Sequence, residues 1–227
     1  MTAEEWWQDP GFLAFDTETT GTDPSSDRIV TAAVALFRRG RAMEMREWLL
    51  AVDVPIPQQS TAVHGITDEI SHTKGQPTEE ALKEIRDVLT ARKLPIVAFH
   101  AIFDVQMLDA NLARFGIDPL TDVPIICPHV IDKHFDKYVK GKNQRRLLPT
   151  TQRYGITLEP EQWHGATADA VAAGSLFLAE VAAFPDLKAF TADHLSAQVD
   201  QWRAEQEADF LAWLARQKAK ESKDGQE

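Results

Sequence analysis

The chain has 227 residues, of which 44% are hydrophobic and 26% are charged. This is the balance of an ordinary soluble globular protein, and the length suits one α/β domain with extensions. The single cysteine, Cys127, excludes an intrachain disulfide and makes a reducing cytoplasm the expected location. We see no run of about 18 apolar residues, so we expect no membrane span.

The formal net charge of −11 bears on the class of ligand. An acidic chain argues against nucleic-acid binding, because contacts with phosphates favour a basic surface. Carboxylates gathered around divalent cations also make a chain acidic, however, and the bound cations then offset that charge. Net charge alone therefore leaves nucleic-acid binding open.

The first quarter of the chain predicts three strands. The first is an apolar run that leads into the turn-forming sequence 16–21. The second is a run rich in Val, Ile, Ala and Thr, and the third follows it after a short turn. The expected strands are residues 12–15, 28–37 and 42–52. Residues 38–41 are expected to form a hairpin turn between the last two strands. Residues 53–60 contain two prolines and are expected to form a loop.

The remainder of the chain is mostly helical by its periodicity. The expected helices are residues 78–92, 103–115, 147–154, 166–183 and 195–217. Thr78 is the expected N-cap of the first helix. Short apolar runs at 95–99 and 123–126 predict two further strands. The basic segment 133–146 is expected to be a partly exposed excursion, and the polar segment 218–227 a disordered tail.

This order of elements predicts an α/β fold with a mixed sheet flanked by helices on both faces. Three strands that can pair antiparallel come first, and strands that alternate with helices follow. No linker divides the chain. We therefore expect one domain over residues 1–190, an amphipathic C-terminal helix over 191–217 and the tail.

Two acids follow the first apolar run. Asp16 and Glu18 are two residues apart on the expected strand, so their side chains point to the same face. They lie at the strand end, where α/β sheets usually bind ligands. Two carboxylates on one face repel unless a cation lies between them, and Mg²⁺ or Mn²⁺ prefers such oxygen ligands. The alternative is a pair of solvated acids.

Three more polar residues occupy similar positions. Asp104 follows an expected strand and opens a helix, where the helix dipole alone would also favour an acid. His164 and Asp169 are five residues apart, so an imidazole and a carboxylate could converge on one pocket. Histidine can take a proton from water near neutral pH, and the alternative for His164 is a surface loop residue.

The ordered combination of these segments resembles the DnaQ-like exonucleases of the DEDDh type, which include the proofreading subunit of the bacterial replicative polymerase. The matching segments are FDTETTG (15–21), VHGITDE (63–69), FHAIFD (99–104), RRLLPTTQRYGI (145–156) and HGATAD (164–169). The resemblance covers residues 12–183. His100 stands where the family commonly has Asn.

The resemblance implies a ribonuclease H-like fold and two divalent cations, Mg²⁺ or Mn²⁺. Their ligands would be Asp16, Glu18, Asp104 and Asp169, with His164 as the general base. Two such ions can stabilise both the attacking and the leaving oxygen of a displacement at phosphorus. The product would be a nucleoside 5′-monophosphate.

The resemblance also implies contacts with the terminal nucleotide. In the family these come from the Thr-rich turn after the first acids and from the histidine of the HGI segment. Thr17, Thr19 and His64 are therefore the expected substrate-binding residues, with Gln59 as a weaker candidate. Thr19 also suits simple turn chemistry.

The expected function is a 3′→5′ exonuclease that acts on single-stranded DNA ends in proofreading, repair or turnover, with a DNA polymerase as a candidate partner. One alternative is the same chemistry on RNA 3′ ends or short oligoribonucleotides, which only the 2′-OH distinguishes. The other is a catalytically silent accessory or nucleic-acid-binding module, against which the presence of every expected ligand argues. The oligomeric state stays open.

Three further groups of residues are open to more than one interpretation. The basic segment 133–146, with Phe135 and Tyr138, could follow a phosphate backbone and stack on bases, or could be a solvated face. Cys127, His129 and His134 lack a fourth zinc ligand, so we expect no zinc site and a buried Cys127. The near-helical spacing of the aromatic residues Trp202, Phe210 and Trp213 favours core packing.

Overall fold

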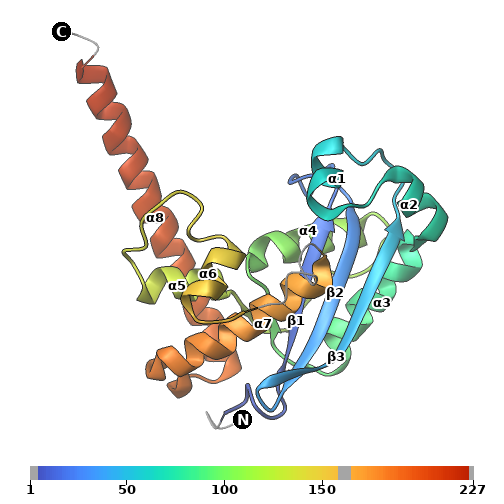
Figure 1. Ribbon diagram of the computed structural model, residues 1–227, viewed down its shortest axis with the longest axis horizontal. Coiled ribbons are helices and arrows are strands. Elements are labelled where there is room, and N and C mark those ends of the chain that lie inside the picture. Colours follow the sequence, from blue (N-terminus) through green and yellow to red (C-terminus); the bar gives the residue numbers. More distant parts are fainter. Residues whose placement is uncertain (1–4, 158–164, 225–227) are drawn as a thin grey trace.

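The computed structural model describes residues 5–157 and 165–224, with side chains as far as residue 218. Its centre is a six-stranded mixed sheet with the order β4-β3-β2-β1-β5-β6 (Figure 1). The strands are β1 (Phe12–Thr19), β2 (Ile29–Arg38), β3 (Arg41–Ala51), β4 (Gln76–Pro77), β5 (Ile96–Val97) and β6 (Ile125–Ile126). Strands β1, β2 and β3 pair antiparallel, while β5 and β6 run parallel to β1 and β4 runs parallel to β3. The expected mixed sheet is confirmed.

The turn between β2 and β3 has two residues. Arg39 and Gly40 have φ angles of 53° and 75°, the left-handed conformation that tight hairpin turns require. Glycine reaches this conformation without steric cost, and the twist of such a turn matches the twist of the two strands. The expected hairpin is confirmed.

Helices cover both faces of the sheet (Figure 1). The helices are α1 (Gln58–His64), α2 (Asp68–Lys74), α3 (Thr78–Ala91), α4 (Ala101–Ala113), α5 (Pro128–Phe135), α6 (Leu147–Arg153), α7 (Ala166–Ala183), the 3₁₀ helix η2 (Pro185–Ala189) and α8 (Ala192–Asp224). Side chains from α3 and α4 share one core with Leu13 and Phe15 of β1. Side chains from α5, α7 and α8 share the other core with Phe12 and Ala14. The alternation along β1 thus divides the apolar residues between two faces.

Two short helices differ from the sequence prediction. Helix α1 begins at Gln58, inside the segment 53–60 that was expected to be a loop, and α2 was not expected. Both have seven residues, which is too short for a helical repeat to be recognised. A local signal was present for α2, since the Thr67 hydroxyl accepts a hydrogen bond from the Ile70 N–H and caps the helix.

The expected role of Thr78 as a helix cap is wrong. Pro77 occupies the N-cap position of α3, and no side chain caps this helix. The Thr78 hydroxyl instead donates a hydrogen bond of 2.6 Å to the Ala51 carbonyl at the end of β3. The start of α3 is therefore fixed by the sheet.

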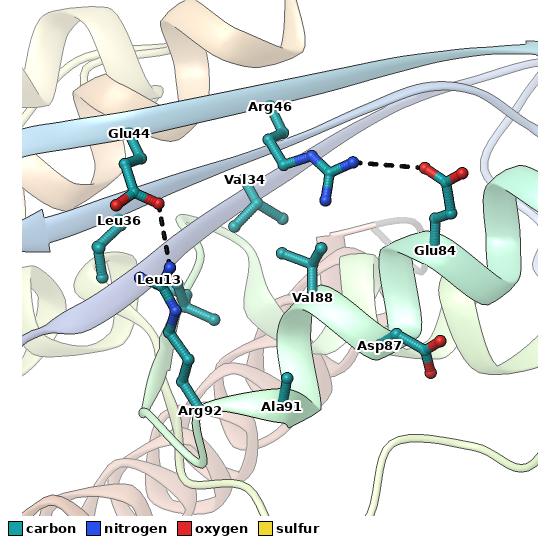
Figure 2. A pocket seen from close by; sticks show the side chains of 10 residues that line it. All are labelled: Leu13, Val34, Leu36, Glu44, Arg46, Glu84, Asp87, Val88, Ala91 and Arg92. Carbon is teal, nitrogen blue, oxygen red and sulfur yellow. Dashed lines mark hydrogen bonds and ion pairs between the residues drawn. The ribbon is translucent and has the colours of Figure 1, made fainter.

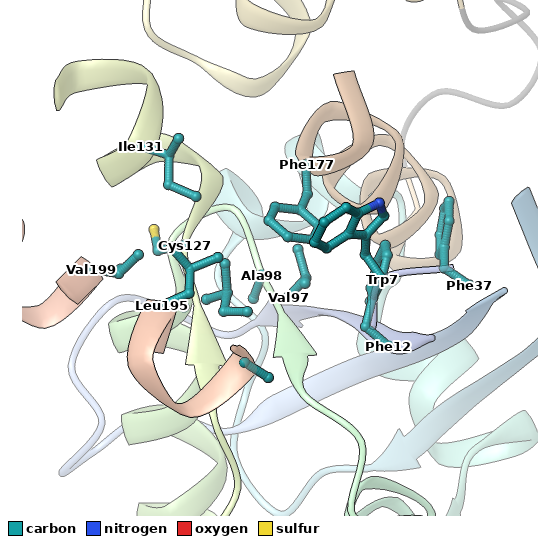
Figure 3. Close-up of a cluster of buried hydrophobic side chains, with 14 of the residues drawn as sticks. Trp7, Phe12, Phe37, Val97, Ala98, Cys127, Ile131, Phe177, Leu195 and Val199 are labelled. Carbon is teal, nitrogen blue, oxygen red and sulfur yellow. The ribbon is translucent and has the colours of Figure 1, made fainter. Parts of the chain in front are cut away.

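Helix α7 packs closely on the sheet through an aromatic cluster (Figure 3). Phe12 stacks on Phe37 with ring centroids 5.0 Å apart, and Phe177 of α7 meets Phe12 edge-on at 5.3 Å. The absence of a side chain at Gly174 allows this approach, because a Cβ there would lie 2.3 Å from the Phe37 ring. This packing sets the height of α7, and with it the position of Asp169, above β1.

The apolar composition of α7 has a second consequence. By length and composition alone, this helix could cross a membrane, with a mean hydropathy of 1.4 over 18 residues. The expectation that no run has this character is therefore wrong. Half of the window is buried within the protein, and a core helix passes the same test. Packing against the sheet accounts for its hydropathy.

Helix α8 begins at Ala192 and continues to Asp224, so the disorder expected from residue 218 is not observed as far as Asp224. Its first third joins the core through Leu195, Val199 and Trp202, and the rest projects away from the domain (Figure 1). Core packing is confirmed for Trp202 and is wrong for two aromatic residues farther along, Phe210 and Trp213, which are 56% and 47% exposed. The boundary at residue 190 between domain and extension stays a prediction.

A glycine-to-alanine substitution tests the packing of α7. Gly174→Ala should lower the free energy of unfolding by up to about 2 kcal/mol, because overpacking costs about 1–3 kcal/mol and the gain in helix propensity returns about 1 kcal/mol. Gly165→Ala, at the N-cap of the same helix, is the matched control, because the added Cβ would meet no atom of the non-adjacent described residues within 4 Å. Urea unfolding measures both, and equal stability of the two variants would contradict the packing argument.

Candidate active site

Three carboxylates meet between β1 and α7. Asp16 and Glu18 lie on the face of β1 that also carries Phe12 and Ala14, and α7 crosses this face. Asp169 is in the first turn of α7. One ligand oxygen from each of Asp16, Glu18 and Asp169 lies within 4.8 Å of the others. The expected shared face of the two strand acids is confirmed, and the helix adds the third carboxylate.

Asp104 approaches from the other side of β1. It lies in the first turn of α4 and is only 3% exposed. Its Oδ1 accepts two hydrogen bonds from Thr17, one from the backbone N–H at 3.2 Å and one from the hydroxyl at 2.8 Å. Thr17 stands between Asp16 and Glu18 in β1, so these bonds hold the fourth carboxylate beside the other three.

Burial and mutual repulsion disfavour the charged forms of these acids. Burial, followed by the charges of Asp104, Asp169 and Glu18, raises the pKa of Asp16 well above its usual value. Burial, followed by Asp169, raises the pKa of Glu18 to about 7. Burial raises the pKa of Asp104 to about 7 despite the opposing hydrogen bonds from Thr17. Close carboxylate oxygens held against repulsion are the donors that a hard divalent cation requires, so the residues fit such an ion.

Comparisons with known proteins agree with this arrangement. The family model described as Exonuclease (RNase_T) matches residues 13–177. The chain belongs to the DnaQ-like exonucleases. A DNA polymerase III PolC-type protein of Streptococcus suis is 32% identical over 171 residues, which cover 74% of this chain and 11% of that protein. A DNA polymerase III subunit epsilon-like protein of Rhodobacter capsulatus is 34% identical over 172 residues, which cover 74% of this chain and 23% of that protein.

The chain thus spans less than a quarter of the length of either relative. Among solved structures, the E. coli ExoI–ssDNA complex is similar with a TM-score of 0.66 and 20% identity, over 78% of this chain and 41% of that chain. Exonuclease X in complex with 5′ overhanging duplex DNA has a TM-score of 0.62 and 18% identity, over 83% and 99% of the two chains. These likenesses show the fold and confirm the expected ribonuclease H-like sheet.

The expected general base, His164, lies outside the part of the chain that the structure describes. It belongs to the segment 158–164. Its neighbour Gly165 is the N-cap of α7, in an extended conformation. The role of His164 stays a prediction.

The expected substrate contacts lie around the end of β1. The Thr19 hydroxyl donates to the Gly21 carbonyl at 2.6 Å, which confirms its turn chemistry. The buried Thr17 hydroxyl bonds Asp104, so the structure gives this residue a positioning role that sequence reasoning missed. The Ser60 hydroxyl, also missed, donates to the Thr20 carbonyl and ties α1 to this turn.

His64 ends α1 next to the same turn. Its ring is 7% exposed, and its Nδ1 accepts a hydrogen bond from the Ile66 N–H at 3.1 Å. Burial lowers the pKa of His64, which favours the neutral ring. Because Nδ1 accepts, the proton is on Nε2, which makes no hydrogen bond of good geometry to a described residue, although the Thr19 backbone partly offsets the effect of burial on the pKa. Gln59 is exposed on the same helix, and neither contact is tested by the structure.

The unusual residue His100 opens α4 at its N-cap position. Its ring lies 4.4 Å from the ring of His129, at a tilt of 49°. His134 instead stacks on Trp202 at 4.0 Å, and the Cys127 thiol donates to the Phe99 carbonyl. Among the described residues, Asp16, Glu18 and Asp169 are the one set of at least three side chains placed to hold a metal.

The basic segment 133–146 is partly folded inward. Asp132, which is fully buried, accepts hydrogen bonds from Arg145 at 2.6 Å and from Arg153 at 2.7 Å. Phe135 stacks on Phe184 at 4.4 Å. Arg145 and the half-buried Phe135 therefore contact the interior, and base stacking by Phe135 is not tested. Tyr138 is 86% exposed, which suits both contact with nucleic acid and a solvated face.

A hollow lies between β3 and α3, away from the carboxylates (Figure 2). It has a volume of about 410 Å³ and an apolar floor that includes Leu13 and Val34, on the opposite face of β1 from Asp16. Ion pairs Arg46–Glu84 at 3.5 Å and Arg92–Glu44 at 3.1 Å bridge it. Polar groups that pair with each other across a hollow favour a structural role for it.

The raised pKa values give a testable dependence of stability on pH. A carboxyl whose pKa is higher in the folded state than in the unfolded state binds more protons when folded, so it stabilises the fold at low pH. With EDTA, this contribution should be present near pH 4 and lost as the pH rises towards about 7, the value reached by Glu18 and Asp104. The measurement is the melting temperature in EDTA between pH 4.5 and 8.

Asp16, Glu18 and Asp169 must be separated from other titrating groups. The control is the double variant Asp16→Asn and Glu18→Gln, which removes two of the repelling charges. The wild type should lose more stability than this variant across the range, and excess Mg²⁺ should remove the difference. Parallel curves for the two proteins in EDTA would contradict the repulsion described above.

Proposed function

We propose that the chain is a metal-dependent 3′→5′ exonuclease that hydrolyses single-stranded DNA from its 3′ end and releases nucleoside 5′-monophosphates. The observation that carries the proposal is the meeting of Asp16, Glu18 and Asp169 within 4.8 Å, with Asp104 held beside them. A scaffolding role has no need for such a cluster, because its repulsion opposes folding.

In this proposal the carboxylates hold two divalent cations, Mg²⁺ or Mn²⁺. Such ions lower the pKa of water and offset the charge that develops on phosphate during an in-line displacement. Asp16 is central to the site, because the charges of all three other acids act on it. Thr17 fixes Asp104 with two hydrogen bonds and so limits the movement of one ligand. His164 would accept the proton of the attacking water.

The terminal nucleotide would lie against the turn after β1. The Nε2–H of His64 makes no hydrogen bond of good geometry to a described residue, although the Thr19 backbone acts on the ring, and burial favours the neutral form. Such a donor can bond a sugar or phosphate oxygen of the substrate. Thr19 and Gln59 would add contacts from the turn and from the exposed surface of α1.

DNA is the proposed substrate because the relatives at 32% and 34% identity are named as DNA polymerase III proteins. A solved structure with the same fold holds single-stranded DNA. These names concern those proteins, and they make a DNA polymerase a candidate partner of this one. Proofreading, repair and turnover all use this reaction.

The test is a time course on 5′-labelled single-stranded DNA and on RNA of the same sequence, with Mg²⁺ or Mn²⁺. The wild type should shorten DNA from the 3′ end, and EDTA should stop it. Asp16→Asn and Asp169→Asn should nearly abolish cleavage, while His164→Ala should reduce it about 10²–10⁴-fold. Asp53→Asn, at an exposed acid paired with Arg28, is the matched control and should keep full activity.

Three outcomes would contradict the proposal in whole or in part. Faster shortening of RNA would replace DNA with RNA as the substrate and leave the chemistry in place. A wild type that binds DNA without cutting it would favour the silent accessory module. Cleavage retained by Asp16→Asn at saturating metal would overturn the metal site itself.

A further inference from the structure

The outer part of α8 presents apolar side chains to solvent. The Gln206 side chain ties this helix to the domain, donating to the Val130 carbonyl at 2.9 Å. Beyond it, Phe210, Leu211 and Trp213 are 56%, 58% and 47% exposed. Isolated helices are marginally stable in water, and most helical stability comes from packing of one face. The projecting half of α8 therefore has a face that suits a partner (Figure 1).

These side chains form a stripe. Phe210, Trp213, Leu214 and Gln217 are spaced by three, four and seven residues, which places them on one side of a helix. The rings of Phe210 and Trp213 lie 5.9 Å apart and nearly parallel. The same side continues back to Gln206, which contacts the domain. We call Phe210, Trp213, Leu214 and Gln217 the α8 stripe.

Charged residues flank the α8 stripe in a definite order. Glu207 and Lys218 are eleven residues apart, close to three helical turns, so they lie on the same flank. Asp209 and Arg216 are seven residues apart, close to two turns, and lie on the other flank. All four are exposed. Each flank thus has an acid on the domain side and a base towards the C-terminus.

We propose that the α8 stripe pairs with the α8 stripe of a second copy of this chain, with the two helices antiparallel. When the pair is centred between Ala212 and Trp213, Glu207 of one copy lies opposite Lys218 of the other, and Asp209 lies opposite Arg216. Such an interface uses the same patch twice and closes on itself. A parallel pair would place acid opposite acid and base opposite base, which is unfavourable.

The antiparallel direction also covers a groove on the domain. A cavity of about 690 Å³ lies between α4, α5 and α8, and its apolar lining includes Ile102, Val105, Val199 and Phe210. Ile102 is 45% exposed. The C-terminal end of the second helix would run back along α8 towards this groove. Both the stripe and the groove would lose exposed apolar area, which favours association.

Charge-reversal variants of the full chain test this pairing through the mass in solution. Sedimentation equilibrium or light scattering at about 0.15 M salt should give the mass of two chains for the wild type. Glu207→Lys with Asp209→Arg makes both flanks basic, and Arg216→Asp with Lys218→Glu makes both acidic. Each double variant should weaken self-association at least tenfold, because like charges then face each other.

Rescue distinguishes the proposed register from a general loss of folding. An equal mixture of the two double variants should again give the mass of two chains, and so should the variant with all four reversals. Glu80→Lys with Asp87→Arg, which makes the same charge change at exposed positions of α3, is the matched control and should remain a dimer.

The proposal would be overturned if the wild type had the mass of one chain at about 100 μM. The Kd of self-association would then be weaker than about 100 μM, too weak for a specific dimer. It would also be overturned by a dimer that both double variants keep, or by a mixture and a fourfold variant that both fail to restore it. None of these outcomes depends on nuclease activity, so the result is independent of the proposed function.

Discussion

Repulsion among half-buried carboxylates is the constraint on which this structure depends. Asp16, Glu18 and Asp169 place oxygens within 4.8 Å of one another, and without a cation this costs folding free energy. The protein holds them on a strand paired on both sides and on a helix packed against it. The site is therefore prepared for cations before they bind, which reduces the reorganisation that binding requires.

One glycine and two hydrogen bonds fix the positions of the other two carboxylates, Asp169 and Asp104. Gly174 lets α7 lie close to Phe37, and this closeness brings Asp169 to the strand acids. Thr17 points to the opposite face of β1 from its neighbours and bonds the Asp104 carboxylate twice. One strand thus positions ligands on both of its sides. In contrast, the outer half of α8 projects away from the sheet and from α7 (Figure 1).

Much of this arrangement was predictable from the sequence. Alternation along β1 and the position of Asp104 after an apolar run required only local patterns, and the expected bounds of α7 match the structure. Contacts between distant residues were not predictable in this way. The bond from Thr17 to Asp104, the pairing of Arg145 with Asp132 and the exposure of Phe210 depend on where chain segments meet, and periodicity carries no information on that. Helices as short as α1 also lack a readable repeat.

The most direct measurement of the central claim is a calorimetric titration of the EDTA-treated full chain with Mn²⁺. The wild type should bind Mn²⁺ saturably at pH 7.5, and Asp169→Asn should lose most of this binding. The control Asp53→Asn, at an exposed acid paired with Arg28, should keep it. This pattern would show that the acids between β1 and α7 form the metal site. Equal Mn²⁺ binding by all three proteins would contradict that account.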